Sequence, residues 1–282
     1  SINSEGSSSL YNRATQGQYA PGSTFKIFTA LEYYREHPDD YMNYQYDCTG
    51  KIVEDNSTIN CYKGEVHGTV NFEQSFAESC NTSFSNIGLQ IDNDSFDALC
   101  NSMLFNTSLP IAFESSKSKF SLSSEDSAAM TMETSIGQGK TMVSPLHMLL
   151  VTSAICNDGV LMKPYLVDHT ENVDGVVVSS SSQSQYSALL SQNESDMLES
   201  LMSAAVSYGT CSKLSGQSYS AYGKTGTAQV SDTTDQTNAW FVGYAKKDGY
   251  NDIAIAVIVE NSGAGSTYAV PIAKNVFDKY FN

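Results

Sequence analysis

The C-terminal part of the chain alternates between strand-like segments and short links. Residues 219–230, 239–246 and 253–260 are rich in β-branched and aromatic side chains, a composition typical of β-strands. Consecutive strands joined by short links pair antiparallel, so the three segments predict a meander. A helical pattern over residues 267–280 follows them and predicts a final helix.

Helical spacing of apolar residues fills most of the remaining chain. The first such helix begins behind the turn pair Pro21-Gly22, and Asn71, with Gln74 three residues on, is typical of a helix N-cap. No internal repeat or linker is visible, so helices and meander are expected to form one α+β body. Helices are expected at 23–37, 71–79, 80–91, 145–157 and 194–208, with shorter strands at 160–167 and 176–179.

The chain is strongly acidic. Its 282 residues include 31 Asp and Glu but only 15 Lys and Arg, a formal charge of −16, and it has no long basic run. Nucleic acids and anionic membrane surfaces are therefore not expected as partners. The longest apolar run, residues 253–259, is too short to span a bilayer, and the polar N-terminus is not a signal sequence. Because the first residue is not Met, we expect a processed or trimmed piece of a longer protein.

The 6 cysteines show no CxxC pair and no Cys/His cluster along the sequence. A metal centre or a thioredoxin-type redox centre is therefore not expected. Cys48 and Cys61 flank a polar loop and could form a disulfide in an oxidising compartment, which would stabilise the fold by about 3 kcal/mol. Independent thiols are the alternative. Cys80 is expected to be a small buried filler.

Ser23 and Lys26 stand three residues apart at the start of the first expected helix, one turn apart on the same face. A serine hydroxyl is a weak acid, but a lysine amine can take its proton if burial or another cation lowers the pKa of the lysine. The pair is a candidate nucleophile and base. Ser116 and Lys119 repeat the spacing in a serine-rich loop that lacks a turn and an apolar helix, so no site is expected there.

A second segment, Ser79-Cys80-Asn81, lies at the junction of two expected helices. There it could present the Ser79 hydroxyl and the Asn81 amide to a cleft. The alternative is that both residues only cap the helices, because Ser and Asn are ordinary capping residues.

A third segment, Lys224-Thr225-Gly226-Thr227, lies in an expected strand, with Lys224 and Gly226 on one face. The lysine and the threonine hydroxyls could hold a carboxylate. Gly226 has no side chain, so the backbone of a ligand could lie against the strand there.

Together and in this order, the three segments resemble the Ser-x-x-Lys, Ser-x-Asn and Lys-Thr-Gly signature of the transpeptidase domain of penicillin-binding proteins, part of the serine acyl-transferase group that includes serine β-lactamases. The match covers nearly the whole chain and looks like the class B, monofunctional type. Flanking segments that also match are 12–14, 21–26, 67–68, 135–139 and 223–229.

This resemblance implies an α+β fold with an antiparallel central sheet flanked by helices. It implies a single domain over residues 1–282 with an inserted all-helical subdomain at roughly residues 38–140. In the family, strands of the sheet precede the nucleophile helix. Residues 1–20 contain no convincing strand, so residues missing from this chain are expected to complete the sheet. No glycosyltransferase segment is present in the chain.

The function that the resemblance implies is D,D-transpeptidation, which cross-links peptidoglycan stem peptides through an acyl-serine intermediate. Ser23 would attack the penultimate D-alanine, Lys26 would take its proton, and Ser79 would relay a proton to the leaving D-alanine. Asn81 would orient the peptide amide, and no cofactor or metal is implied. The substrate-binding residues would be Lys224, Thr225, Gly226 and Thr227, with backbone N–H groups of Ser23 and Thr227 as the oxyanion hole.

The implied partners are a D-Ala-D-Ala donor, an amine acceptor, β-lactams that imitate the donor, and a membrane glycosyltransferase. The implied location is the extracytoplasmic face of the bacterial cell membrane, with the anchor absent from this chain.

Three other functions are weaker alternatives. A serine β-lactamase or β-lactam sensor would share the motifs, but Glu114, Glu125 and Glu133 lack the pattern of a class A deacylating glutamate. A nucleotide-binding protein is suggested by Gly-Lys-Thr at 139–141 and 223–225, but the required upstream glycine is missing from both. A catalytically dead scaffold would not need intact motifs.

Overall fold

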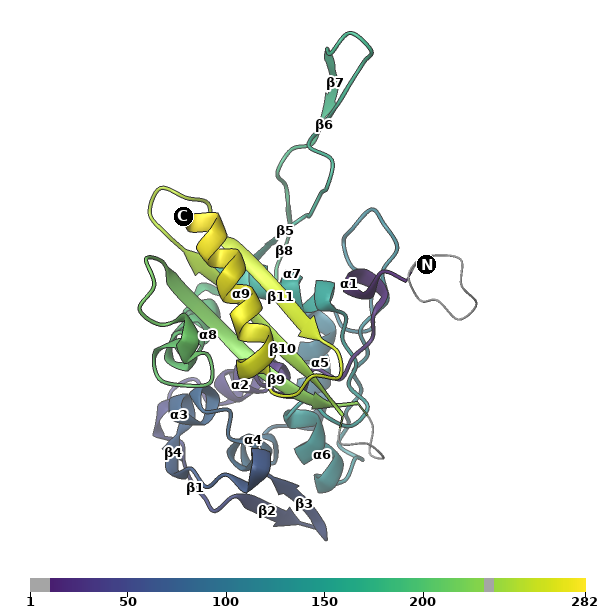
Figure 1. Cartoon of the computed structure of the whole chain (residues 1–282). Coiled ribbons are helices and arrows are strands. Elements are labelled where there is room, and N and C mark those ends of the chain that lie inside the picture. Colours follow the sequence, from purple (N-terminus) through teal and green to yellow (C-terminus); the bar gives the residue numbers. More distant parts are fainter. Residues whose placement is uncertain (1–10, 231–235) are drawn as a thin grey trace.

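The computed structural model describes residues 11–230 and 236–282. At its centre is an antiparallel sheet of β9 (Ser220–Gln229), β10 (Thr237–Lys246) and β11 (Ile253–Val259), in the order β11-β10-β9 (Figure 1). The register pairs Trp240 with Gly226 on one side and with Ile258 on the other. The predicted meander is confirmed, with small shifts at the strand ends.

Helices cover both faces of this sheet. They are α2 (Lys26–Glu36), α7 (Pro145–Cys156), α8 (Gln192–Ser207) and α9 (Gly265–Phe281). Successive side chains of a strand point to opposite faces, and β10 contributes to two hydrophobic cores in this way. Trp240 and Val242 are buried in one core with residues of α2, α7 and α8. Phe241 and Ala245 are buried in the other with residues of α9.

The predicted helix starts are confirmed where a cap was visible in the sequence. Asn71 and Gln74 form a capping box, because the Asn71 side chain accepts from the Gln74 N–H and the Gln74 side chain accepts from the Asn71 N–H. The Ser144 side chain caps α7, whose first residue is Pro145. Such caps satisfy backbone N–H groups that have no partner within the helix.

The segment expected to be all-helical also contains four short strands. Its elements are β1 (Gln45–Cys48), β2 (Lys51–Glu54), β3 (Ser57–Asn60), β4 (Gly68–Asn71), α3 (Phe72–Ala77), α4 (Asn81–Gly88), α5 (Asn93–Ser102) and α6 (Ala128–Ser135). β1 pairs with β4 and β2 with β3, so the all-helical prediction is wrong here. Asp55 and Asn56 join β2 to β3 at φ 47° and 64°, the pair of positive φ angles that a two-residue hairpin turn requires.

Two small ladders project from the body as an arm (Figure 1). β5 (Val160–Met162) pairs with β8 (Gln185–Ala188) at its base, and β6 (His169–Glu171) pairs with β7 (Val177–Ser180) toward its tip. The strand expected over residues 160–167 ends at Met162, whereas the strand expected over residues 176–179 is present as β7. All residues from 165 to 186 are exposed.

The remaining elements are short. They are α1 (Arg13–Gln16), η1 (Gly22–Phe25), η2 (Tyr41–Asn43), η3 (Tyr62–Gly64) and η4 (Ser212–Leu214). Residues 11–20 form α1 and one isolated bridge from Tyr19 to Val143, and residues 1–10 lie outside the described part of the chain. Completion of the sheet by residues outside the chain stays a prediction.

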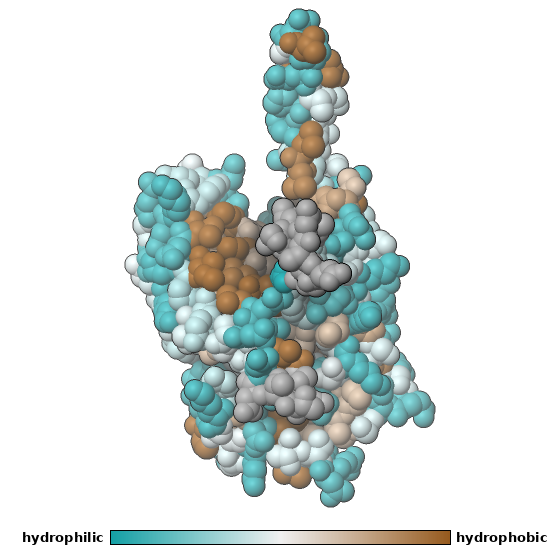
Figure 2. All heavy atoms as spheres, turned by 45° about the vertical axis from the view of Figure 1, so that its right-hand side comes forward, coloured by the Kyte–Doolittle hydropathy of each residue, from teal (hydrophilic) through white to brown (hydrophobic). Residues whose placement is uncertain are grey.

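The outer edge of β11 borders an apolar groove. Within the described residues β11 pairs only with β10, and Ile253 on β11 lines the groove with Ile272, Val276 and Tyr280 on α9. The groove coincides with the brown patch on the body in Figure 2. None of the helices in the described ranges is long and apolar enough to cross a membrane.

Candidate active site

Ser23 lies on a tight turn that leads directly into a buried helix. Residues Gly22–Phe25 form the 3₁₀ turn η1, and α2 begins at Lys26. The helix was predicted to begin at residue 23, but α2 begins at Lys26. The difference arises because the 3₁₀ turn before it continues the same apolar pattern. Ser23 is half-buried, whereas Lys26 is fully buried. Ser23 is thus partly accessible on the turn, and the side chain of Lys26 is enclosed by the protein.

Glycines allow this turn to lie close to strand β9. Gly22 has φ +53°, and a Cβ on it would lie 2.9 Å from the Thr227 carbonyl oxygen. A Cβ on Gly226 would lie 2.8 Å from the Pro21 carbonyl oxygen and 3.1 Å from Thr24. Atoms of the protein's own nucleophile turn thus fill the position that a side chain on residue 226 would take. The expected approach of a ligand backbone to the strand edge at Gly226 stays a prediction.

Ser79 ends helix α3 in the left-handed backbone conformation, with φ 60°. The N–H of Ser79 donates to Phe76 O (3.1 Å) and the N–H of Cys80 donates to Ser75 O (2.9 Å), the two bonds of a Schellman motif. Glycine usually occupies the left-handed position, and a serine there carries strain of about 1 to 2 kcal/mol. The Cys80 side chain, rather than Ser79 or Asn81, caps α4.

The three motifs meet around the side chain of Ser79. Lys26 Nζ donates to Ser79 O at 2.7 Å and to Asn81 Oδ1 at 2.8 Å, and lies 3.4 Å from Ser79 Oγ. Lys224 Nζ, from β9, donates to the same Ser79 Oγ at 2.7 Å. The Asn81 amide donates to Asn60 O at 3.1 Å. The Ser79 hydroxyl thus lies between two buried amines from different parts of the chain.

Both amines are shifted toward their neutral form. Burial lowers the pKa of Lys26, and the nearby positive charge of Lys224 lowers it further, to well below its usual range. Burial lowers the pKa of Lys224 to about 8. Each amine also lies over an aromatic ring, Lys26 at 5.3 Å from the centre of Phe84 and Lys224 at 5.4 Å from the centre of Phe76. The lowered pKa suits Lys26 to act as a base, and Lys224, with a pKa of about 8, carries a positive charge at neutral pH.

A neutral Lys26 amine has two N–H donors and one lone pair. The carbonyl oxygens of Ser79 and Asn81 use both donors. The third position, which is the lone pair of a neutral amine, faces the Ser79 hydroxyl 3.4 Å away. This arrangement orients the amine for proton transfer with a hydroxyl.

The two threonines of the third motif lie on the other face of β9 from Lys224. Thr225 is buried, and its hydroxyl donates to Thr210 Oγ1 at 2.6 Å. Thr227 is half-buried, and its Oγ1 accepts from the Gly265 N–H at 3.4 Å. The structure thus brings the side chains of Lys26, Ser79, Asn81 and Lys224 together. The turn that carries Ser23 packs against Gly226 of β9. The hydroxyls of Thr225 and Thr227 bind other parts of the protein.

His147 and Trp240 have structural roles in the fold. His147 is buried, its Nε2 donates to Met103 O at 2.7 Å, and burial lowers its pKa to about 4. Trp240 of β10 is buried, and its indole N–H donates to the carbonyl oxygen of Ala20, which precedes the Ser23 turn, at 3.1 Å. Lys119 is exposed, and its backbone pairs with Met142, in keeping with the absence of an expected site at Ser116 and Lys119.

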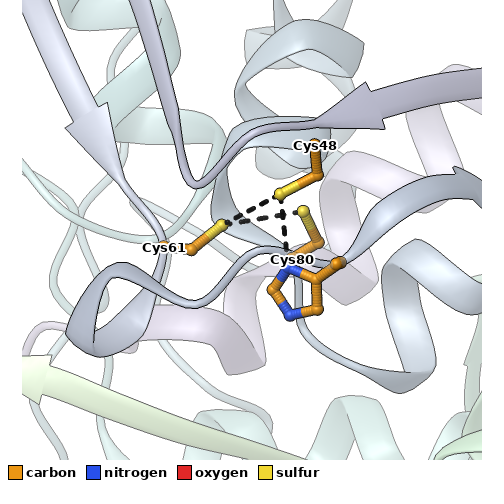
Figure 3. Close-up of side chains that lie close together, drawn as sticks. Cys48, Cys61 and Cys80 are labelled. Carbon is orange, nitrogen blue, oxygen red and sulfur yellow. Dashed lines mark hydrogen bonds between the residues drawn. The ribbon is translucent and has the colours of Figure 1, made fainter.

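The cysteines depart from the sequence interpretation. Cys48, Cys61 and Cys80 lie together with His67 (Figure 3), and Cys80 belongs to the Ser79–Asn81 segment. The sequence contains no such cluster because these residues are far apart along it and meet only in the fold. All three cysteines are free, and Cys48 Sγ and Cys61 Sγ are 3.7 Å apart, so the structure contains no disulfide between them.

The comparison with known families identifies the class of protein. Residues 2–278 match the penicillin-binding protein transpeptidase domain family, and the chain belongs to that family. A peptidoglycan D,D-transpeptidase, PbpA of Mycolicibacterium smegmatis, is 30% identical over 95% of this chain and 56% of its own length. Stage V sporulation protein D of Bacillus subtilis is 26% identical over 95% of this chain and 43% of its own length. The chain thus spans about half the length of these relatives.

Solved structures agree with the family assignment. The D,D-transpeptidase domain of a peptidoglycan glycosyltransferase from Eggerthella lenta matches with a TM-score of 0.85 and 26% identity, over 99% of this chain and 70% of that one. Penicillin-binding protein A of M. tuberculosis, as its penicillin G acyl-enzyme complex, matches with a TM-score of 0.84 and 26% identity, over 97% of this chain and 63% of that one. The predicted α+β transpeptidase fold is confirmed.

Proposed function

We propose that the protein is a serine D,D-transpeptidase that cross-links peptidoglycan stem peptides and that β-lactams acylate. The observation that carries this proposal is the convergence of Lys26, Asn81 and Lys224 on Ser79 beside the Ser23 turn. The relatives named as peptidoglycan D,D-transpeptidases and the β-lactam acyl-enzyme of a similar structure support it. A buried lysine with a lowered pKa, one helical turn after a partly exposed serine, supplies the base and the nucleophile that serine acyl transfer needs.

Ser23 Oγ attacks the carbonyl carbon of the penultimate D-alanine, and its proton passes to the lone pair of Lys26 Nζ. Backbone N–H groups of Ser23 and Thr227 stabilise the oxyanion, a contribution of about 3 to 4 kcal/mol for a single donor. Ser79 relays a proton to the departing D-alanine amine as the carbon–nitrogen bond breaks. The product is an ester on Ser23, and an acceptor amine then attacks it and forms the cross-link.

Lys224 binds the terminal carboxylate of the donor, and Asn81 orients both the peptide amide and Lys26. Thr225, Gly226 and Thr227 remain in the proposed substrate-binding strand. Among them Gly226 acts by letting the Ser23 turn approach β9. Because stem peptides lie outside the cytoplasmic membrane, we place the protein at its extracytoplasmic face, with a membrane glycosyltransferase as a partner in wall synthesis.

Intact-mass measurement after incubation with penicillin tests the proposal. The expected result is a stable increase by the mass of one drug molecule, which Ser23→Ala abolishes and Ser116→Ala, in the second Ser-x-x-Lys copy, does not. Rapid loss of the adduct with drug hydrolysis would indicate a β-lactamase instead. No adduct on a folded protein would contradict catalysis at Ser23.

A further inference from the structure

Three thiols and one imidazole form a compact buried cluster. The sulfur atoms of Cys48, Cys61 and Cys80 and a ring nitrogen of His67 all lie within 4.8 Å of one another (Figure 3). Cys61 Sγ is 3.7 Å from both other sulfurs, and Cys48 Sγ is 3.3 Å from His67 Nδ1. The three cysteines are at most 3% exposed.

These distances fit a tetrahedral metal site. Zinc binds cysteine sulfur at about 2.3 Å and histidine nitrogen at about 2.0 Å, so its ligands lie about 3.8 Å apart for two sulfurs and about 3.6 Å apart for sulfur and nitrogen. A disulfide would need about 2.05 Å between the sulfurs. The cluster is therefore spaced for a common central ion and not for a covalent bond.

Two separate strand pairings bring the ligands together. Pairing of β1 with β4 sets Cys48 opposite Gly68, which places His67 next to Cys48. The β2–β3 hairpin brings Cys61 back next to Gly50, and the Cys61 N–H donates to Gly50 O at 2.9 Å. Cys80 reaches the same point as the N-cap of α4. The fold itself positions all four side chains.

Hydrogen-bond donors surround the sulfur atoms, and such donors stabilise thiolates, which are the metal-binding form of cysteine. Thr82 Oγ1 lies 3.1 Å from Cys48 Sγ, and the Ser83 N–H lies 3.4 Å from Cys80 Sγ.

We propose that Cys48, Cys61, Cys80 and His67 bind one zinc ion, through the three sulfurs and Nδ1 of His67, and that this ion fixes the segment carrying Ser79 and Asn81. The ion replaces the thiol protons, which pass to solvent, and the imidazole binds in its neutral form. Three soft sulfur ligands favour zinc over magnesium or calcium. Glu65, whose carboxylate is 3.8 Å from His67 Nε2, would orient the imidazole.

The zinc site is structural, because all four positions of the tetrahedron are protein ligands. Cys80 lies between Ser79 and Asn81 in the chain, and the Asn81 side chain binds the carbonyl of Asn60, the residue before Cys61. The ion therefore connects α4 to the β2–β3 hairpin directly behind the side chains that contact Lys26. This positioning role rests on the proposed function, whereas zinc binding does not.

The first test measures metal in the protein that carries this chain, purified without chelator. Elemental analysis is expected to find one zinc ion per chain. Cobalt substituted for zinc is expected to give the charge-transfer and intense visible bands of a tetrahedral thiolate site. Cys80→Ser keeps a side chain that can cap α4 but removes a ligand, so zinc affinity falls at least about 100-fold. The matched control Cys156→Ser, outside the cluster, keeps the zinc.

A folded protein, judged by circular dichroism, that binds neither zinc nor cobalt would overturn the proposal. So would a disulfide among Cys48, Cys61 and Cys80 in protein purified and digested under native redox conditions. Glu65→Gln is a milder variant that leaves all four ligands in place, and its zinc affinity should fall about 10-fold. Equal zinc content in Cys80→Ser and Cys156→Ser would also contradict the assignment.

A second measurement separates zinc binding from its effect on Ser79 and Asn81. Chelation is expected to lower the melting temperature and to slow penicillin acylation of Ser23 about 10-fold, and added zinc should restore both. Zinc binding without a change in acylation would refute the positioning role alone. Zinc binding in a protein that never forms the penicillin adduct would refute the proposed function and leave the metal site standing.

Discussion

At the scale of single residues, Ser79 combines a strained backbone with a central place among the side chains of the candidate site. Its φ of 60° is one that glycine adopts without cost. Its hydroxyl, however, receives a hydrogen bond from Lys224 and lies close to Lys26. A glycine would relieve the strain but remove the hydroxyl. Strain that persists at a functional position in this way is common in active sites.

Replacing Ser79 by Gly or by Ala separates these two contributions. Both variants lose the proton relay, so penicillin acylation should slow about 100-fold or more in each. Glycine accepts the left-handed conformation and alanine does not, so Ser79→Gly should be about 1 kcal/mol more stable than Ser79→Ala. Urea unfolding measures the difference. Equal stability of the two variants would argue against backbone strain at this position.

The pKa of Lys224 sets an upper pH limit for recognition of carboxylates. This pKa is lowered to about 8 by burial, so the positive charge is present below that pH and disappears above it. Acylation by a β-lactam that carries a carboxylate should therefore fall as the pH rises through about 8. Lys224→Arg keeps its charge throughout this range and should lose this alkaline decline.

Stopped-flow acylation rates across this pH range provide the measurement. A rate for the unmodified protein that stays constant from about pH 7 to about pH 9 would contradict the role of Lys224. At acidic pH the pKa of Lys26 controls the rate. Because the charge of Lys224 lowers that pKa, Lys224→Gln should move the acidic decline to higher pH.

At the scale of elements, strong local patterns were sufficient to predict structure. The meander at residues 220–259 could be predicted because long strands alternate toward two cores, and the starts of α3 and α7 because Asn71 and Ser144 are capping residues. The strands β1 to β4 could not, because they are four residues long and almost none of their residues is buried. Short polar strands lack the alternation from which strands are inferred.

The residues of the candidate site could be proposed from the sequence because each motif keeps its members close together. The Cys48, Cys61, Cys80 and His67 cluster was not, because no two of its ligands share a short motif. Two strand pairings and a helix cap bring them together. The packing of Gly226 could not be predicted either, since only the fold shows that Pro21 lies against it. Contacts between distant segments are the information that a single sequence lacks.

At the scale of the whole molecule, one hydrophobic core connects the sheet to the segment predicted as a subdomain. This core contains Trp240 and Tyr244 of the sheet together with Phe72, Phe96 and Phe105 from the segment at residues 38–140. Phe105 also packs edge-on against Phe25 and Phe28 beside the Ser23 turn. We therefore propose that residues 11–282 unfold as a single unit.

Two probes in different parts of the molecule test this cooperativity. Trp240 is the only tryptophan and reports on the sheet by fluorescence. Far-ultraviolet circular dichroism is dominated by the helices, including those of residues 38–140. The two denaturation curves should coincide, and the calorimetric and van't Hoff enthalpies should agree. Two separated transitions would mean that the segment is an independent domain.

The arm formed by β5 to β8 offers a practical opportunity. Gly175 lies in the turn at its tip, and a Cβ on this residue would have no other atom within 4 Å. The residues around it are exposed. Exposed turns of this kind accept inserted sequence well. A short epitope or a fluorophore at the tip would project from the body, away from the Ser23 turn, so the protein could be located by microscopy without altering the candidate site.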